Sequence, residues 1–323
     1  MRTRRLLTLC LLAACAPGAV TAQELRTGIA ASPVVVAGRH VGVRLLGNDF
    51  ILHKIAVLNP LRGAPGDTVT VVEWKDLTDH NRPTVADTRL YCLHAVQNPA
   101  RLGLPAGTYY RMDGHAGTHP RLDAQALAEG REPLVPFVRL VLAADDMPLE
   151  ELKVKLVETA LGGRGPAATE AALMLSDRPS LLDRLDTLDL SGLLAKASAE
   201  TDDIDRKLAL ATVCAERAMP TLIDALALTW ASIDDERFHR AMGRFAHKLH
   251  GEDATEVLQA HWQRARTAKA RGNVVVAIGA TGTESALETL LRMRKLDAND
   301  RYVEAALRLH GAPRAVDAIQ RRL

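Results

Sequence analysis

The C-terminal part of the chain repeats itself at a fixed spacing, and this repeat limits the folds that the chain can adopt. Leu249-His250-Gly251 recurs sixty residues later as Leu309-His310-Gly311, and Ile278-Gly279 lies nearly midway between the two. A residue of apolar character lies four positions before each of these turns: Phe245, Val274 and Ala305. A period near thirty residues, in which each unit holds two short helices, predicts a stack of helix pairs.

A second stretch with apolar residues at helical spacing follows each turn. These residues are Val257, Leu258, His261 and Trp262, then Leu287, Leu290 and Leu291, then Val316 and Ile319. A fainter copy consists of Leu210 to Val213, a break at Met219-Pro220, and Leu222, Ile223 and Leu226. The pattern resembles the short HEAT-like repeats of bacterial proteins. That resemblance implies a curved α-solenoid over about the last 120 residues, with residues 149–200 as an extension, used as a binding scaffold.

The segment 273–291, NVVVAIGATGTESALETLL, has the order strand, glycine loop and helix that is typical of nucleotide sites. A phosphate loop would add Gly-Lys-Ser/Thr or the third glycine of Gly-x-Gly-x-x-Gly, and this segment has neither. Gly279 and Gly282 instead occupy the place of Gly251 and Gly311 in the neighbouring repeats. We therefore expect a helix here that these glycines end by adopting a left-handed conformation.

Residues 30–122 predict a small β domain, because short valine-rich stretches alternate with turn residues. The expected strands are SPVVVAGRHVGVRL, NDFILHKIAVL, TVTVVEW, TRLYCLHAV and GTYYRM. Several short strands of this kind predict a small barrel or sandwich. Their order, with VLNPLRG between strands and a late LYCL strand, resembles the OB-like barrels of the netrin and TIMP type, without the disulfides typical of that type.

A transition segment, residues 123–148, separates this β domain from a helical repeat domain, residues 149–323. The stretch LVPFVRLVLAADD within the transition fits a last strand or a first helix, and its periodicity does not decide between them. The helical domain is expected to begin with LEELKVKLVETAL, whose apolar stripe is Leu149, Leu152, Leu156 and Ala160. The predicted fold is thus a small N-terminal β-barrel or sandwich followed by a C-terminal α-solenoid of HEAT-like helix pairs.

The N-terminus has the pattern of an export signal, because basic MRTRR precedes apolar LLTLCLLAA and small residues follow. Two cleavage sites remain open. Val20-Thr21-Ala22 suits signal peptidase and would release residues 1–22, whereas Leu12-Ala13-Ala14-Cys15 resembles a lipobox and would release residues 1–14. We expect an exported bacterial protein that is periplasmic, secreted, or held at the outer membrane only through a lipid on Cys15.

Composition excludes some classes of partner. Aromatic residues make up only 3% of the chain, which makes a platform for stacking nucleic-acid bases difficult to build. Without Arg2, Arg4 and Arg5 of the signal, 41 − 3 = 38 basic residues face 39 acidic ones, so no overall positive charge favours nucleic acid.

Cys92 and Cys214 could pair in an oxidising compartment, but they fall in different predicted domains, so we favour two buried thiols.

The strongest candidate metal site is the loop MDGHAGTHP, which contains Asp113, His115 and His119. These side chains could reach one zinc ion if the loop folds back, with a further ligand from Asp79, His80 or His94. The same residues also suit a solvated turn after a strand. No paired motif such as His-Glu-x-x-His supports the metal, so no cofactor is expected and a metal-dependent enzyme is the alternative interpretation.

A second histidine cluster consists of His247, His250 and His261. His250 belongs to the repeated Leu-His-Gly, and the equivalent His310 has no such neighbours. This favours histidines that bond the last carbonyls of a helix over histidines that bind a metal.

Two carboxylates, Glu73 and Asp76, flank Trp74 at the end of an expected strand. Such a pair can flank the bond that a glycosidase cleaves, but carboxylates in this position are more often solvated. We expect both side chains to face solvent.

The sequence therefore favours a non-enzymatic scaffold that binds a protein partner. In HEAT-like solenoids the second helix of each pair commonly lines the concave face, which implies helices near 254–266, 284–295 and 313–323. The polar residues expected on that face are Gln259, Gln263, Arg264, Arg292, Lys295, Arg321 and Arg322. This basic surface would favour an acidic partner.

Overall fold

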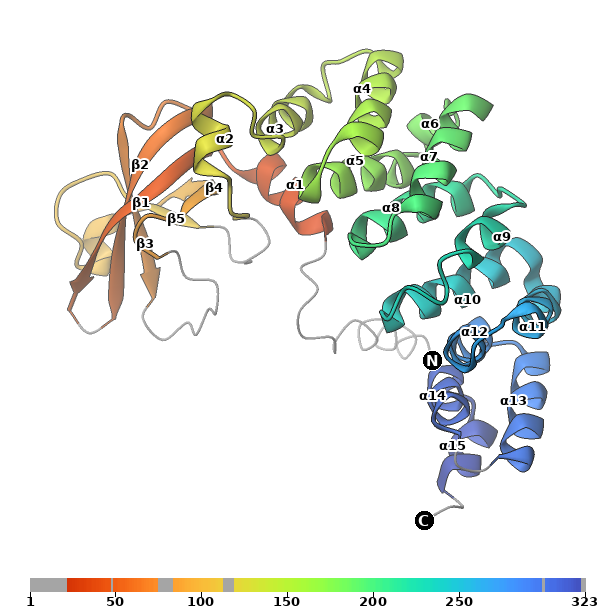
Figure 1. Cartoon of the computed structure of the whole chain (residues 1–323). Helices are drawn as coiled ribbons and strands as arrows, with labels where there is room; N and C mark the ends of the chain where they lie inside the picture. The colour runs from red at the N-terminus through yellow and green to blue at the C-terminus, as the bar shows by residue number, and fades with distance from the viewer. Residues whose placement is uncertain (1–21, 48, 75–83, 113–118, 298–299, 321–323) are drawn as a thin grey trace, which may run out of the picture. The chain divides into compact units, whose positions relative to one another are not determined.

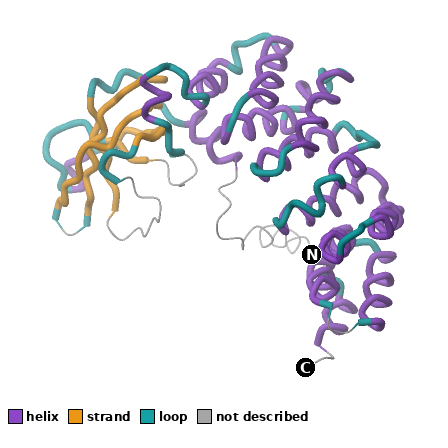
Figure 2. Tube along the Cα trace, in the orientation of Figure 1, coloured by secondary structure: helices purple, strands orange, loops and turns teal. Residues whose placement is uncertain are grey.

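The computed structural model describes residues 22–47, 49–74, 84–112, 119–297 and 300–320, and all structural statements concern these residues. The chain divides into two compact units, Met1–Arg131 and Glu132–Leu323. The first is a small β-barrel and the second is helical, which confirms the order of the two expected parts (Figures 1 and 2).

The barrel unit contains five described strands, and each overlaps a stretch that the sequence predicted, although β2 continues through residues 59–62, which were expected in the connection between two strands. They are β1 (Val34–Leu46), β2 (Phe50–Arg62), β3 (Thr68–Trp74), β4 (Thr88–Ala95) and β5 (Tyr110–Met112). The strands close in the order β1-β2-β3-β5-β4, with β3 and β5 parallel and the other neighbours antiparallel. Three short helices accompany them: α1 (Ala22–Ala31), η1 (Pro99–Leu102) and α2 (Ala124–Ala128).

Apolar side chains from alternate positions of the strands fill the barrel. Its central cluster consists of Val36, Ile55, Val69, Val71, Tyr91 and Leu93. Gly38 allows β1 to approach β2 closely, because a Cβ atom at this position would overlap the side chain of Ile55. The valine-rich stretches between turn residues therefore identified the five strands.

The helical unit is built from helices of 3 to 15 residues. They are α3 (Leu134–Ala143), α4 (Leu149–Gly162), α5 (Gly165–Asp177), α6 (Pro179–Leu182), α7 (Thr187–Ala199), α8 (Ile204–Glu216), α9 (Leu222–Ala227), α10 (Glu236–His250), η3 (Gly251–Asp253), α11 (Ala254–Arg264), α12 (Ala268–Thr281), α13 (Glu284–Leu296), α14 (Arg301–His310) and α15 (Pro313–Gln320). The stretch LVPFVRLVLAADD forms α3, with Leu134, Phe137 and Val138 buried on one side. Within the described residues, no helix has the length and apolar character that crossing a membrane requires.

The valine-rich segment of the expected glycine loop lies inside α12, as predicted. Helix α12 packs against α10, α11, α13 and α14, and residues 272–279 are buried. Contacts on all sides therefore stabilise a helix despite the β-branched run Val274–Val276.

The helix-ending role is confirmed for three of the four glycines in the repeated turns. Gly251, Gly282 and Gly311 follow α10, α12 and α14 with φ of 56°, 70° and 69°. For Gly279 the prediction is wrong, because this residue lies within α12 against the backbone of Ala306 in α14. Its lack of a side chain allows close helix packing rather than a turn.

Candidate functional site

The predicted metal site can be tested only at His119 and His94, because Asp113, His115, Asp79 and His80 lie outside the described residues. His94 Nε2 lies 3.3 Å from the hydroxyl of Ser32. His119 is buried, and its Nδ1 accepts a hydrogen bond from the backbone N–H of Cys92 at 3.3 Å. Among the residues that the structure describes, no three histidine, cysteine or acidic side chains are grouped as metal ligands would be.

A buried polar chain crosses three neighbouring strands of the barrel. His40 lies on β1, His53 on β2 and Glu73 on β3, and all three side chains are buried. His53 Nε2 lies 2.7 Å from Glu73 Oε2, and His53 Nδ1 lies 3.2 Å from His40 Nε2. The prediction that Glu73 is solvated is therefore wrong, while Asp76 lies outside the described residues.

The carboxylate at one end of this chain orders the protons along it. A carboxylate can only accept, so His53 donates from Nε2 to Glu73 and its neutral ring accepts at Nδ1. His40 then donates from Nε2 to His53, which leaves His40 Nδ1 as a lone pair. This atom is buried and has no hydrogen-bond partner among the residues that the structure describes.

Sequence analysis did not single out His40 and His53, although alternation along the strands contained the signal. His53 lies two positions from the buried residues Ile51 and Ile55. Glu73 likewise follows Val71 by two positions on β3. Residues at this spacing share one face of a strand, so their burial could have been inferred.

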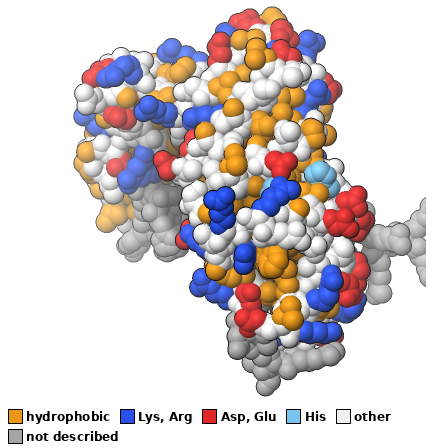
Figure 3. All heavy atoms as spheres, turned by 45° about the vertical axis from the view of Figure 1, so that its right-hand side comes forward, with side chains coloured by type: hydrophobic (Ala, Val, Ile, Leu, Met, Phe, Trp, Pro, Cys, Tyr) orange, Lys and Arg blue, Asp and Glu red, His pale blue; other side chains and the backbone are white. Residues whose placement is uncertain are grey.

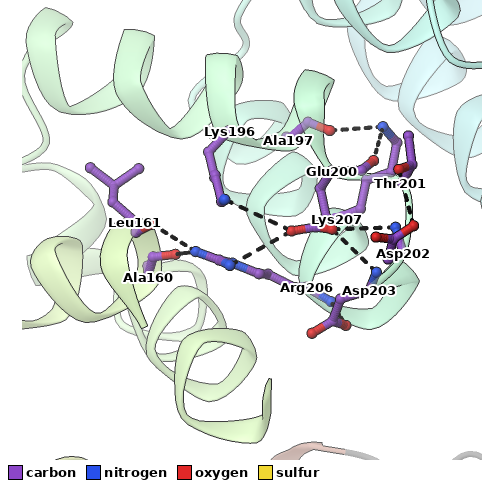
Figure 4. A network of polar contacts seen from close by, with 10 residues as sticks. All are labelled: Ala160, Leu161, Lys196, Ala197, Glu200, Thr201, Asp202, Asp203, Arg206 and Lys207. Carbon is purple, nitrogen blue, oxygen red and sulfur yellow. Dashed lines mark hydrogen bonds and ion pairs between the residues drawn. The ribbon is translucent and has the colours of Figure 1, made fainter. Parts of the chain in front are cut away.

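A second buried polar network lies in the helical unit, where Arg206 and Lys207 begin α8 (Figure 4). Lys207 is fully buried, and its Nζ donates to the carbonyl oxygens of Ala197 at 2.7 Å and Glu200 at 3.0 Å. The same ammonium group lies 5.1 Å from the ring centre of Phe238. Burial lowers the pKa of Lys207 to about 8, although the nearby Glu200 acts in the opposite direction.

Arg206 makes the equivalent contacts to a different helix. Its Nη2 donates to the carbonyl oxygens of Ala160 at 2.8 Å and Leu161 at 2.7 Å, near the end of α4 (Figure 4). Its Nη1 lies 3.6 Å from the carboxylate of Glu200. Because the last carbonyls of a helix lack partners within the helix, cations placed there stabilise both its hydrogen bonding and its dipole. This network therefore has a structural role.

The hydroxyl groups of the glycine-loop segment bond to one another and to the backbone. Thr283 Oγ1 lies 2.8 Å from Thr255 Oγ1 and 3.3 Å from Thr281 Oγ1. It also accepts a hydrogen bond from the N–H of Ala286, which caps α13. The Thr283 hydroxyl therefore serves as the N-terminal cap of α13.

The histidines of the helical unit contact different partners. His310 Nε2 donates to the carbonyl of Thr283 at 2.9 Å, so it bonds the backbone before α13 rather than the end of its own helix. His261 Nε2 lies 3.3 Å from Asp224, and burial lowers the pKa of this histidine.

Several residues of the expected partner-binding face already contact neighbouring helices. Gln259 donates to Thr289 Oγ1 at 2.8 Å, and Arg264 lies 3.9 Å from Asp224. Gln263, Arg292 and Lys295 are exposed. Arg321 and Arg322 lie outside the described residues. Figure 3 shows basic and acidic side chains interspersed over the face that it presents.

Comparison of the chain with protein-family models, curated proteins and solved structures finds no match. The residues and contacts described above are therefore the basis for assigning a function.

Proposed function

We propose that this chain is an exported, non-enzymatic binding protein whose helical unit is a HEAT-like α-solenoid that binds a protein partner. The N-terminal unit would be an OB-like barrel, and its strand order β1-β2-β3-β5-β4 supports this assignment. After export the protein would be periplasmic or secreted, or anchored at the outer membrane through Cys15.

The observation that carries the proposal is the way in which successive first helices pack. A Cβ atom on Gly243 in α10 would overlap the backbone of Ala277 in α12. Gly279 in α12 meets Ala306 in α14 in the same way. Close contacts repeated from one pair to the next are what a stack of like units requires, since each unit buries its apolar side against its neighbours.

The second helices α11 and α13 would then provide the partner-binding face. Their apolar residues Leu258, Leu287 and Leu290 are buried, while Arg264 and Arg292 are exposed. Exposed basic groups would accelerate encounter with an acidic partner and make the association depend on salt.

The test is capture of partners from a cell-envelope extract by the wild type and by an Arg264→Glu/Arg292→Glu/Arg321→Glu variant. A control variant, Arg101→Glu/Arg111→Glu, reverses two exposed charges of the barrel unit. We expect the triple variant to stay folded and to lose the partner, because exposed charges contribute little to stability. Equal affinity of the captured protein for the triple variant and the wild type would exclude this face.

A further inference from the structure

The first helices of successive pairs follow one another through the helical unit in the order α5, α8, α10, α12 and α14 (Figure 1). Helix α8 packs along α5, and α10 and α14 both pack along α12. By contrast, α8 and α10 approach each other closely over a much smaller part of their lengths. The helical unit therefore consists of a first block, α3 to α9, and a second block, α10 to α15, which meet at the joint between α8 and α10.

Backbone contacts hold the second block together. A Cβ atom on Gly243 in α10 would overlap the backbone of Ala277 in α12. Helix α12 meets α14 in the same way at Gly279. Helices whose backbones touch cannot tilt against each other without overlap, because the interior is already close-packed.

At the joint, large side chains lie between the two helices. The buried ring of Phe238 in α10 faces the ammonium group of Lys207 in α8, with 5.1 Å from the nitrogen to the ring centre. Lys207 also donates to the carbonyl of Ala197 in α7, which fixes α8 within the first block. Side chains can change rotamer, so contacts of this kind allow packed helices to shift against each other.

The connection between the two blocks can bend at one place. The carbonyl of Trp230 accepts a hydrogen bond from Asn273 Nδ2 of α12 at 3.0 Å, so the turn before α10 belongs to the second block. Helix α9 belongs to the first block, because Ser198 Oγ of α7 donates to the carbonyl of Ala225 at 2.9 Å. Leu228 lies between these two attachments and is 81% exposed.

Ion pairs cross the joint at both ends of α8 and α10. Arg237 Nη1, at the start of α10, lies 2.8 Å from the carboxylate of Asp205 at the start of α8. Lys248 Nζ, near the end of α10, lies 2.5 Å from the carboxylate of Glu216 at the end of α8. Together the two pairs set the angle between these helices.

Charged contacts also connect the second helices α9 and α11. Asp224 of α9 lies 3.3 Å from His261 Nε2 and 3.9 Å from Arg264 Nη1 of α11. The three carboxylates of the first block, Asp205, Glu216 and Asp224, are 65%, 38% and 68% exposed. Attraction between exposed charges is weak and is screened by salt. The contacts across the joint should therefore weaken as the salt concentration rises.

We propose that the joint is a salt-sensitive hinge: the helical unit bends near Leu228, and the charged contacts across the joint hold it in the arrangement seen here. Bending changes the angle between α9 and α11, while α10, α12 and α14 stay packed on one another. The hinge does not rest on partner binding, although a face on α11 and α13 would move together with the second block.

Distances between spin labels, measured by double electron–electron resonance on the full chain, test the hinge. One pair of labels spans the joint, at Leu188→Cys in α7 and Leu296→Cys in α13, since both leucines are highly exposed. A control pair, Glu252→Cys with Leu296→Cys, lies within the second block, and Glu252 is also exposed.

The labels are read in a Cys10→Ser/Cys15→Ser background, since the remaining Cys92 and Cys214 are buried and should not react. Between about 0.01 M and about 1 M salt the screening length falls from about 30 Å to about 3 Å. We expect the distance distribution across the joint to shift and widen over this range, while the control pair keeps its distribution. Equal distributions at both concentrations, or an equal change in both pairs, would overturn the hinge.

A charge variant tests the contacts themselves. Asp205→Asn/Glu216→Gln/Asp224→Asn removes the three carboxylates that face the second block. At low salt this variant should give the distribution that the unsubstituted charges give at high salt. Unchanged helix content, measured by circular dichroism at 222 nm, shows that the shift reports bending rather than unfolding.

The matched control is Glu236→Gln/Glu284→Gln/Glu288→Gln. It also removes three exposed carboxylates from ion pairs, but their partners Arg240 and Arg314 belong to the second block as well. This variant should keep the low-salt distribution across the joint. If the first variant kept it too, the charged contacts would not hold the joint and the proposal would be wrong.

Discussion

Gly279 of α12 lies so close to Ala306 of α14 that a Cβ atom on Gly279 would overlap the Ala306 backbone. Gly279→Ala should therefore destabilise the helical unit by about 1–3 kcal/mol, the usual cost of overpacking. This cost exceeds the roughly 0.5–1 kcal/mol that alanine gains over glycine within a helix. Urea denaturation followed by circular dichroism at 222 nm would measure the difference.

Gly192 provides the control, because it lies within α7, where a Cβ atom would meet only the side chain of Leu161 at 3.5 Å. Gly192→Ala should stabilise the helical unit by about 0.5–1 kcal/mol through helix propensity alone. If the two substitutions had the same effect, close contact at Gly279 would not be the reason for its glycine.

Lys207 should make the helical unit more stable as the pH rises above 8. Its pKa is about 8 in the folded protein, because burial disfavours the ammonium ion, and 10.5 is the ordinary value. Between these values the unfolded chain binds a proton that the folded chain does not, so the free energy of unfolding rises with pH. The total rise in the free energy of unfolding is roughly 2–4 kcal/mol.

The Lys207 contribution is measured as the difference between the wild type and Lys207→Met, since other groups that titrate cancel. Urea denaturation at intervals from pH 7.5 to 10.5 should show the wild type gaining stability relative to the variant. A constant difference over this range would mean that Lys207 keeps its proton in the folded protein.

His239 should make the same unit sensitive to acid. Burial lowers its pKa from 6.5 to about 4, although Asp234, Asp235 and Glu236 act in the opposite direction. Below pH 6.5 the unfolded chain takes up a proton that the folded chain excludes, so stability falls, by about 3 kcal/mol at pH 4. Denaturation of His239→Gln beside the wild type should show a smaller loss between pH 6.5 and 4, and parallel curves would contradict the assignment.

Glu73→Ala should destabilise the barrel by about 1–3 kcal/mol, because it removes the acceptor for the buried Nε2–H of His53. Glu73→Gln retains an acceptor and should destabilise the barrel less than Glu73→Ala does. Fluorescence of Trp74 would report barrel unfolding in a background with Trp230→Phe and Trp262→Phe. Equal stability of Glu73→Ala and the wild type would show that the chain of histidines does not need its carboxylate.

The N-terminus of the processed protein distinguishes the two cleavage sites. Mass spectrometry of protein recovered from the cell envelope should find either a diacylated Cys15 or an unmodified chain that begins at Gln23. Exported protein that retains residues 1–22 would rule out the signal altogether.

The fold could be predicted where local pattern and tertiary contacts agree. Valine-rich stretches between turn residues identified the strands, and the repeated turns identified α12 as a helix in spite of Val274–Val276. The error at Gly279 arose because a glycine that ends a helix and a glycine that allows close packing look alike in sequence. Only the contact with Ala306 distinguishes them.

Buried polar residues were harder to predict, because charged and polar side chains are usually expected to face solvent. Lys207 lies three and four positions before Leu210 and Ala211, on the buried stripe of α8, but the sequence does not contain the carbonyl groups that satisfy it. His40 and His53 likewise share the spacing of buried neighbours, while the hydrogen bond between them depends on how β1 pairs with β2.

Arg206 and Lys207 are adjacent in sequence, yet they hold the ends of two different helices, α4 and α7. Adjacent side chains leave an α-helix about 100° apart, so the two contacts together fix the angle of α8 about its own axis. A rotation that kept one contact would break the other and leave a buried cation without acceptors, which is costly. Leucine and alanine side chains tolerate several such angles, since dispersion contacts are not directional. The pair therefore determines which rotational setting of α8 the packed unit accepts.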